Sequence, residues 1–400
     1  MSAPLKVAVV LGTRPEAIKL APVIGRLRSD DRFTPIVCST GQHREMLDQV
    51  LVLFDITTDH DLRVMRPNQA LPDLMGAVLT GMTRVIAATG PDLLMVQGDT
   101  TTAMAAAMAA YYQRVPVVHL EAGLRSGDMS APWPEEMNRR TISLLASIHL
   151  APTERSRQTL IDEGVVEDDI CLTGNTVIDA LIEVDSSLRR DTGRAATLQS
   201  RFPMLRADRK LLLVTCHRRE SWGAGIESVC SAVRTIASRG DVDIIYPVHR
   251  HPNAQAAPHR ILGGLPNVHL VEPLDYAEFV YLLGRSYFVI TDSGGVQEEA
   301  PALGKPVLVI RETTERPEGV AAGVARLVGT SHDSIVEHAR QLLDQKTIYE
   351  AMSHAVSPYG DGHASRRTAD FMAAWCNSAR MRAHRGPTAV AAVAAGAPRG

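Results

Sequence analysis

Acidic side chains follow two predicted buried strands and a rigid loop. Asp99 comes after the apolar run Leu93–Val96, and Glu121 comes after Val115–Leu120. Glu135 lies soon afterwards, in a segment that also holds two prolines and a tryptophan. A carboxyl group that is placed beside a substrate can act as a general acid or base. The three residues are therefore candidates for proton transfer.

Each of these acids also has a structural alternative. Asp99 could cap the helix that is expected after it, which is the commoner role of an Asp in that place. Glu121 could form a structural ion pair with Arg125. Glu135 and the neighbouring Glu136 could open a helix, since acidic residues are favoured in a first turn. Residue types and spacing alone leave both interpretations open.

The strongest local signal is the segment Thr291–Ala300, which follows an apolar strand and opens a helix. Backbone amides of successive small residues can form an anion site at a helix N-terminus, here Ser293, Gly294 and Gly295. Glu299, one turn later, could accept hydrogen bonds from a ribose diol. A glycine turn without a ligand is the alternative interpretation.

Basic residues also follow the predicted strands. Arg14 and Lys19 lie at a helix start, where backbone amides already favour an anion. His217 is followed by two arginines, a set that could bind a diphosphate, and Arg316 comes soon after the predicted strand Pro306–Ile310. The alternatives are solvated basic side chains and a structural histidine. Charge that recurs at successive strand ends nevertheless favours an anionic, polar ligand.

These residues are positioned by strands and helices that alternate. Short, fully apolar runs followed by helical patterns indicate parallel sheets that are covered on both faces. The pattern restarts after about residue 175. We therefore expect an α/β chain with two doubly wound domains that face a cleft, with ligands at the carboxyl ends of the strands.

Composition excludes several classes of protein. The chain has 400 residues, 45% of them hydrophobic, with a formal net charge of −3. We expect a soluble, cytoplasmic protein that binds neither nucleic acid nor membrane, and no apolar stretch near the length of a spanning helix. The five scattered cysteines indicate neither disulfides nor a zinc site. No GxGxxG motif follows the first strand, which argues against a dinucleotide redox cofactor.

Many ordered motifs resemble those of the non-hydrolysing UDP-N-acetylglucosamine 2-epimerase family. The resemblance runs from about Lys6 to about Phe371. Its motifs include GTRPEAIKLAPVI (12–24), QGDTTTAMA (97–105), HLEAGLRSGD (119–128), PWPEEMNRR (132–140), LTGNTVIDAL (172–181), CHRRESWGAGI (216–226), the long segment 291–319 and PYGDG (358–362).

The resemblance implies the GT-B fold, with two Rossmann-like domains and a nucleotide sugar in a central cleft. It implies an N-terminal domain over 1–175, joined by a C-terminal helix at about 364–380, and a UDP-binding domain over 176–363. We expect the tail 381–400 to be disordered. Transfer of the family pattern, position by position, implies these substrate-binding residues: Arg14, Lys19, Arg139, His217, Phe279, Ser293, Gly294, Gly295, Glu299 and Arg316. It implies these catalytic residues: Asp99, Glu121, Glu135 and His217.

The implied activity is the reversible C2 epimerisation of UDP-GlcNAc to UDP-ManNAc, an isomerase reaction. UDP leaves by anti elimination, 2-acetamidoglucal stays bound, and UDP adds back. The resemblance implies no metal and no cofactor, a homodimer, and a product that supplies ManNAc-type sugars for surface polysaccharide. Three alternatives remain: a hydrolysing epimerase that releases ManNAc and UDP, a glycosyltransferase, and a non-catalytic nucleotide-sugar sensor.

Overall fold

The structure is a computed structural model that describes residues 3–42, 44–66, 69–218 and 222–378. The chain divides into two compact units. The first unit comprises residues 1–176 together with 363–400, and the second comprises 177–362. The tail 381–400, for which the sequence predicts disorder, lies outside the described residues.

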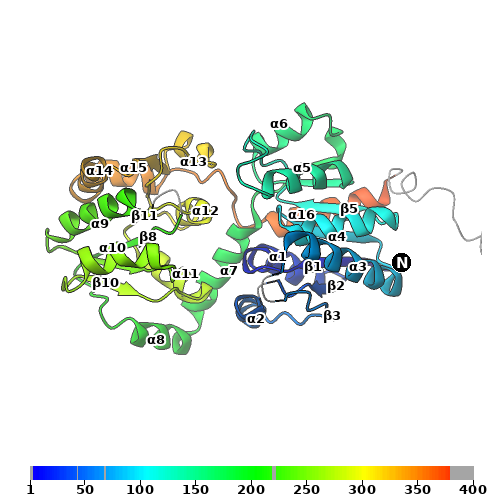
Figure 1. Cartoon of the computed structure of the whole chain (residues 1–400), viewed down its shortest axis with the longest axis horizontal. Coiled ribbons are helices and arrows are strands. Elements are labelled where there is room, and N and C mark those ends of the chain that lie inside the picture. Colours follow the sequence, from blue (N-terminus) through cyan, green and yellow to red (C-terminus); the bar gives the residue numbers. More distant parts are fainter. Residues whose placement is uncertain (1–2, 43, 67–68, 219–221, 379–400) are drawn as a thin grey trace, which may run out of the picture. The chain divides into compact units, whose positions relative to one another are not determined.

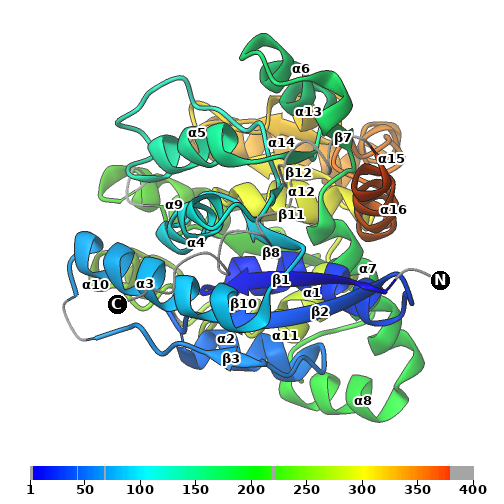
Figure 2. The ribbon, with the colours of Figure 1, turned by 90° about the vertical axis from the view of Figure 1, so that its right-hand side faces the viewer.

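The first unit is built on a seven-stranded parallel sheet with the order β3-β2-β1-β4-β5-β6-β7. Figure 2 shows β1 and β2 side by side in blue. Its strands are β1 (Leu5–Leu11), β2 (Phe33–Ser39), β3 (His60–Asp61), β4 (Leu93–Gln97), β5 (Val117–Leu120), β6 (Ile148–Ala151) and β7 (Ile170–Leu172). Because all strands run in parallel, the loops after β1, β4 and β5 leave from the same edge of the sheet.

Helices connect these strands. They are α1 (Arg14–Arg28), α2 (Arg44–Leu53), α3 (Leu71–Thr89), α4 (Thr101–Tyr112), α5 (Glu135–Leu145) and α6 (Glu154–Asp162). Helix α1 begins with a capping box, in which Thr13 and Glu16 each accept a hydrogen bond from the other's backbone amide. Helix α4 is rich in alanine, and its small buried side chains allow α3 and α5 to pack closely on it.

The C-terminal helix α16 (Ala364–Asn377) belongs to the first unit, where Figure 1 shows it in orange-red. It packs on α1. The Trp375 indole donates a hydrogen bond to Asp169 at 2.9 Å, and the Arg367 guanidinium donates one to the Thr173 carbonyl at 3.0 Å. Asp370 pairs with Arg32 at 2.7 Å. Helix α16 is therefore tied to residues beside β7 and β2 that are distant in sequence.

The second unit has a six-stranded parallel sheet with the order β10-β9-β8-β11-β12-β13. The strands are β8 (Lys210–Thr215), β9 (Val242–Pro247), β10 (Val268–Val271), β11 (Phe288–Thr291), β12 (Val307–Val309) and β13 (Ala325–Leu327). The helices are α7 (Thr176–Arg190), which begins at the boundary, α8 (Thr192–Arg201), α9 (Ala224–Ala237), α10 (Pro252–Leu262), α11 (Tyr276–Arg285), α12 (Gly294–Ala302), α13 (Pro317–Ala321), α14 (His332–Asp344) and α15 (Lys346–Ser353).

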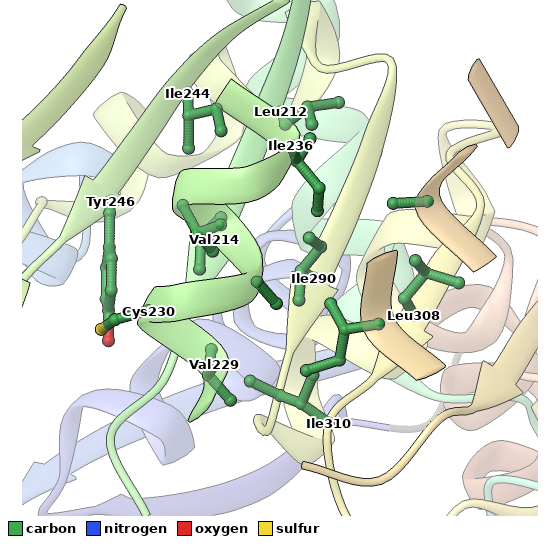
Figure 3. Close-up of a cluster of buried hydrophobic side chains, with 14 of the residues drawn as sticks. Leu212, Val214, Val229, Cys230, Ile236, Ile244, Tyr246, Ile290, Leu308 and Ile310 are labelled. Carbon is green, nitrogen blue, oxygen red and sulfur yellow. The ribbon is translucent and has the colours of Figure 1, made fainter. Parts of the chain in front are cut away.

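Figure 3 shows how the core of this unit is packed. Val214, Ile244 and Ile290 come from neighbouring strands, and they meet Val229 and Ile236 from α9. All five side chains are buried. Removal of this apolar surface from water stabilises the sheet at about 25 cal/mol per Å². The core holds the carboxyl ends of β8 and β11 in register, and the loops that leave there carry the second set of candidate residues.

The α/β class that the sequence predicts is confirmed by the two parallel sheets. The short strands β3, β6, β7 and β13 were not predicted from the sequence. The expectation that no apolar stretch comes near the length of a spanning helix is wrong. Among the described residues, the 19-residue helix α3, with mean hydropathy 1.2, is long and apolar enough to cross a membrane. One such helix is weak evidence, because core helices pass the same test, and α3 buries Val78 and Met82 against α4.

Candidate active site

Glu121 follows β5 and has a left-handed backbone, with φ of 66°. This conformation is rare for a residue with a side chain. The Lys19 Nζ donates to both carboxylate oxygens, at 2.6 and 2.7 Å. The Asn175 amide donates to Oε1 at 3.1 Å, and the Gln97 amide donates to Oε2. The structural pair of Glu121 with Arg125, the alternative considered above, is wrong, because Arg125 pairs with Glu163 at 2.6 Å.

Asp99 lies just after β4 and forms an ion pair with Arg139 of α5. It is not the N-cap of α4: the Thr100 hydroxyl accepts the capping hydrogen bond from the Ala103 amide. Burial raises the pKa of Asp99, and the Arg139 guanidinium offsets this only in part, while the charge of Glu121 raises it further. The site therefore favours proton uptake by Asp99 more than water would.

A third acid, Glu16, connects the loop after β1 with the loop after β4 that carries Asp99. Its carboxylate accepts from the Gly12 and Thr13 amides at 3.0 and 2.7 Å, and from the Thr100 hydroxyl at 2.6 Å. Gly12 cannot be replaced without a shift, since a Cβ there would lie 2.2 Å from the Thr40 hydroxyl oxygen. The loop after β1 is thereby fixed to the residue that follows Asp99.

The two acids at the start of α5 differ. Glu135 is half-buried, and no ion pair holds its carboxylate in the part of the chain that the structure describes. Glu136 is fully buried and pairs with Arg140 at 3.0 Å and Arg139 at 3.4 Å. Burial acts to raise the pKa of Glu136, but the Ser126 amide and both arginines hold it below its usual range. Glu136 therefore stabilises the loop, whereas Glu135 is the one of these two acids that has no ion pair with any described residue.

The predicted binding residues of the first unit are only partly explained by this geometry. Lys19 holds Glu121, and Arg139 lies between Asp99 and Glu136. Arg14 is the first residue of α1, beside the same loop. Of these three cations, Lys19 and Arg139 thus serve carboxylates of their own unit.

In the second unit, α12 begins at Gly294 and its N-cap, Ser293, makes no side-chain capping bond. A Cβ on Gly294 would lie 3.7 Å from an Arg218 guanidinium nitrogen and 4.0 Å from one of Arg316. Two guanidinium groups therefore lie close to the start of a helix. Such a start already favours anions through its free amides and its dipole.

Arg316 is held from both ends. Its guanidinium forms an ion pair with the buried Glu298, in the first turns of α12. Its carbonyl accepts a hydrogen bond from the Tyr359 hydroxyl at 3.2 Å, and that hydroxyl accepts one from the Gly319 amide at 2.9 Å. Tyr359 belongs to the PYGDG motif and is fully buried. The motif thus fixes the backbone that presents Arg316.

His217 follows β8, and its Nδ1 lies 3.0 Å from the Asp292 carboxylate. The other Asp292 oxygen accepts from the His217 and Arg218 amides at 2.7 and 2.8 Å. Burial acts to raise the pKa of Asp292, but His217 and these amides hold it below its usual range. The ring of His217 is therefore oriented by a buried anion, while its side chain remains 44% exposed.

The remaining predicted residues lie around α12. The Glu299 carboxylate is buried and accepts a hydrogen bond from the Tyr276 hydroxyl at 2.9 Å. Its other oxygen lies 3.9 Å from the place of a Cβ on Gly295. Phe279 lies on α11, three residues after Tyr276, and is half-buried. Within the described ranges, no group of three or more His, Cys, Asp or Glu residues could hold a metal ion.

Comparison with known proteins identifies the class. A family model described as UDP-N-acetylglucosamine 2-epimerase matches residues 25–373. A UDP-N-acetylglucosamine 2-epimerase of Salmonella typhimurium is 52% identical over 365 residues, 91% of this chain and 97% of that protein. The chain belongs to the UDP-N-acetylglucosamine 2-epimerase family. The expected isomerase class is thereby confirmed.

Other members of the 2-epimerase family are similarly close to this chain in sequence and structure. A probable UDP-N-acetylglucosamine 2-epimerase of Ralstonia nicotianae is 55% identical over 363 residues, 90% of this chain and 97% of that protein. The crystal structure of the Neisseria meningitidis UDP-GlcNAc 2-epimerase bound to UDP-GlcNAc is 46% identical, with a TM-score of 0.86. The structural alignment covers 92% of this chain and 99% of the Neisseria meningitidis chain.

Several side chains that hold the predicted site residues of this 2-epimerase family member were not predicted from the sequence. Gln97 and Asn175 contact Glu121, Asp292 contacts His217, and Tyr359 contacts Arg316. Gln97, Asn175 and Asp292 lie inside or beside motifs that the resemblance uses, and Tyr359 lies within PYGDG. Their roles depend on which loops meet at a sheet edge, and no spacing rule predicts that.

Proposed function

We propose that this chain interconverts UDP-GlcNAc and UDP-ManNAc by elimination and re-addition of UDP. The C2–H electron pair becomes the C1=C2 double bond of 2-acetamidoglucal, and the C1–O pair leaves with UDP. A carboxylate takes the C2 proton. On return, UDP adds to C1 while a proton arrives on the other face of C2. The single observation that supports this proposal is that one unit holds a diphosphate-type site and the other holds ordered carboxyl groups.

The second unit supports binding of the leaving group. The start of α12, with Arg218 and Arg316 beside it, would stabilise the charge that develops on a departing diphosphate. His217 adds a donor that Asp292 orients. Glu299 is placed one turn into the helix, where it could accept hydrogen bonds from the ribose hydroxyls. Phe279, on the neighbouring α11, would contact the uracil base.

The first unit supports the proton chemistry. The C2 hydrogen of a GlcNAc residue is not next to a carbonyl, so its removal needs a positioned base and a leaving group that departs at the same time. General acid–base groups contribute roughly 10²–10⁴-fold to such steps. Asp99, Glu121 and Glu135 supply the carboxyl groups, and a simple nucleotide-sugar sensor would have no need of them.

A related epimerase bound to UDP-GlcNAc, with a TM-score of 0.86 to this chain, supports the same substrate here. We propose further that the product supplies ManNAc-type sugars for surface polysaccharide, and that the chain works in the cytoplasm without a metal or another cofactor.

The experiment is incubation of the purified chain with UDP-GlcNAc in deuterated water, followed by NMR. We expect deuterium at C2 of both epimers, with UDP still attached to the sugar. Free ManNAc and UDP would instead indicate the hydrolysing class. An unchanged sugar nucleotide that nevertheless binds would indicate a sensor, and transfer to an added acceptor would indicate a glycosyltransferase.

We also propose a homodimer. Tyr111 and Tyr112, at the end of α4, are 55% and 69% exposed, and Leu144 on α5 is 86% exposed. Helices α4 and α5 pack together, so these apolar side chains lie on adjoining helices. Large exposed apolar side chains that gather in one region mark interaction surfaces. Size-exclusion chromatography with light scattering should give twice the chain mass of 43.3 kDa.

A further inference from the structure

The Glu121 carboxylate is surrounded by donors from three separate parts of the first unit. Lys19 comes from α1, Gln97 ends β4, and Asn175 follows β7. Both carboxylate oxygens accept two of these hydrogen bonds, since Lys19 donates to each. The Glu121 side chain is only 7% exposed. Its left-handed backbone adds a second constraint on the direction in which the carboxylate points.

A carboxylate in such a setting is poorly suited to carry a proton. An ionised carboxylate is an acceptor only, and protonation converts one oxygen into a donor. At Glu121, that oxygen would face the N–H groups of Lys19 and of either Gln97 or Asn175, so at least one contact would break. A proton carrier in a reversible reaction must change its charge and recover it in every turnover. The arrangement around Glu121 opposes that change.

Asp99 and Glu135 are held much less firmly. The Asp99 side chain is 27% exposed and has Arg139 as its ion-pair partner. Burial raises its pKa, and the fixed negative charge of Glu121 adds to this, so proton uptake is favoured there. Glu135 is half-buried at the first residue of α5, with no ion pair in the described part of the chain. Both side chains can gain and lose a proton without the loss of several contacts.

We propose that Glu121 acts as a permanently charged anion, that Gln97 and Asn175 are positioning residues which hold it together with Lys19, and that Asp99 and Glu135 carry the protons. This assignment rests on the proposed epimerase function. One of the two carriers takes the C2 proton of UDP-GlcNAc, and the other takes the C2 proton of UDP-ManNAc. Glu121 opposes the positive charge that grows at C1 as the bond to UDP breaks.

The assignment predicts which losses depend on the direction of the reaction. The test is a single-turnover measurement of UDP and 2-acetamidoglucal, started separately from each epimer. We expect Asp99→Asn to lose elimination at least about 100-fold from one epimer and less than tenfold from the other. Glu135→Gln should show the opposite preference. Glu121→Gln should lose elimination at least about 100-fold from both epimers.

Binding separates these effects from general damage. UDP affinity should stay within about twofold of wild type in all three variants, because the proposed UDP site lies in the other unit. Loss from one epimer only in Glu121→Gln would overturn the assignment, and so would equal losses from both epimers in Asp99→Asn and Glu135→Gln. If the unmodified chain eliminates UDP from neither epimer, the proposed function itself fails.

The positioning residues need their own test. Gln97→Met removes one donor and keeps the length of the side chain, and Asn175→Leu removes the other. We expect kcat to fall about 10–100-fold from both epimers, with KM changed by less than threefold, because each variant leaves the anion less firmly held. Gln113→Met is the matched control, since the Gln113 amide donates to the Thr83 carbonyl instead.

The pH profile distinguishes positioning from a structural role. Charged and titratable groups that face Glu121 in the described part of the chain include Lys19, Asp99 and His119. Loss of a donor destabilises the ionised form of Glu121, so the acidic limb of kcat should move to higher pH in Gln97→Met and activity should recover in alkali. If that variant does not fold, Asn175→Leu provides the same test. An unchanged acidic limb in a folded variant would overturn the role of its residue.

Discussion

In the first unit donors hold an acid, whereas in the second unit buried acids hold donors. Lys19, Gln97 and Asn175 surround the Glu121 carboxylate. By contrast, Arg316 is held by Glu298 and His217 by Asp292, and both of these acids are almost fully buried. The two units have similar parallel sheets and opposite arrangements of charge at the strand ends.

This contrast would suit one sheet architecture to the two tasks proposed above. A buried carboxylate costs free energy unless it is paired and hydrogen-bonded. In the second unit this cost is offset by the pairing of Glu298 with Arg316 and of Asp292 with His217. In the first unit the pairing is made at Glu121 itself, and Asp99 remains partly exposed beside it. The position of the buried partner thus determines from which direction a ligand could approach each charged group.

The largest effect should come from Lys19, which tests whether a cation of the first unit serves the acid or the diphosphate. Lys19→Met should lower kcat at least about 100-fold, because the buried Glu121 loses its charged partner, and should reduce stability by about 3–5 kcal/mol. Because Lys19 serves Glu121, the affinity for UDP should change less than twofold in titration calorimetry. A large loss of UDP affinity would show that Lys19 binds the diphosphate. Lys6→Met is the control, because the Lys6 amine contacts only the exposed carbonyl of Thr89 among the hydrogen bonds of the described residues.

The next effect concerns Arg316 in the second unit. Arg316→Gln should weaken UDP binding about 10–100-fold, since a hydrogen bond to a charged group contributes about 1.5–3 kcal/mol. The control is Arg326→Gln, which removes a guanidinium that pairs with Gln341 in the same unit. If calorimetry gave the same UDP affinity for Arg316→Gln and wild type, the proposal that UDP binds at the start of α12 would be wrong.

A smaller effect should follow from Tyr359→Phe, which leaves the ring in place and removes one hydroxyl. Its bonds to the Arg316 carbonyl and the Gly319 amide would be lost, at about 0.5–1.5 kcal/mol each. We expect UDP binding to weaken about three- to tenfold and kcat to change little. Tyr349→Phe, in a ring stacked on Tyr287, is the control. Equal UDP affinities in the two variants would contradict a role for Tyr359 behind Arg316.

The smallest effect on activity is expected at His119, which instead makes the stability of the chain depend on pH. Burial lowers the pKa of His119 from 6.5 to about 3, so the folded chain keeps this ring neutral. Below pH 6.5 the unfolded chain takes up a proton that the folded chain does not, so stability falls by about 1.4 kcal/mol per pH unit down to about pH 3. Urea unfolding at pH 7 and pH 5 measures this. His119→Gln should show a smaller loss over that interval, and an equal loss would contradict the assignment.

Much of the fold could be predicted from local patterns. The strands around Val9, Met95 and Leu213 are short apolar runs, and the structure places a parallel strand at each of them. Strands β7 and β13 have three residues each, and neither lies in an uninterrupted apolar run like Pro306–Ile310, which contains the equally short β12. The helix at Gly294 was predicted because small residues directly after a strand are typical of such a turn.

Sequence by itself determined the family, the α/β class and the motifs at the strand ends, because these depend on residue types at fixed local spacing. Only the tertiary structure decided that Glu121 pairs with Lys19 and not with Arg125, and that Thr100 caps α4 in place of Asp99. It also placed Tyr359 behind Arg316, 43 residues away in the chain. The physical reason is that a hydrogen bond depends on distance and direction, and loops from distant segments meet only when the sheet is formed.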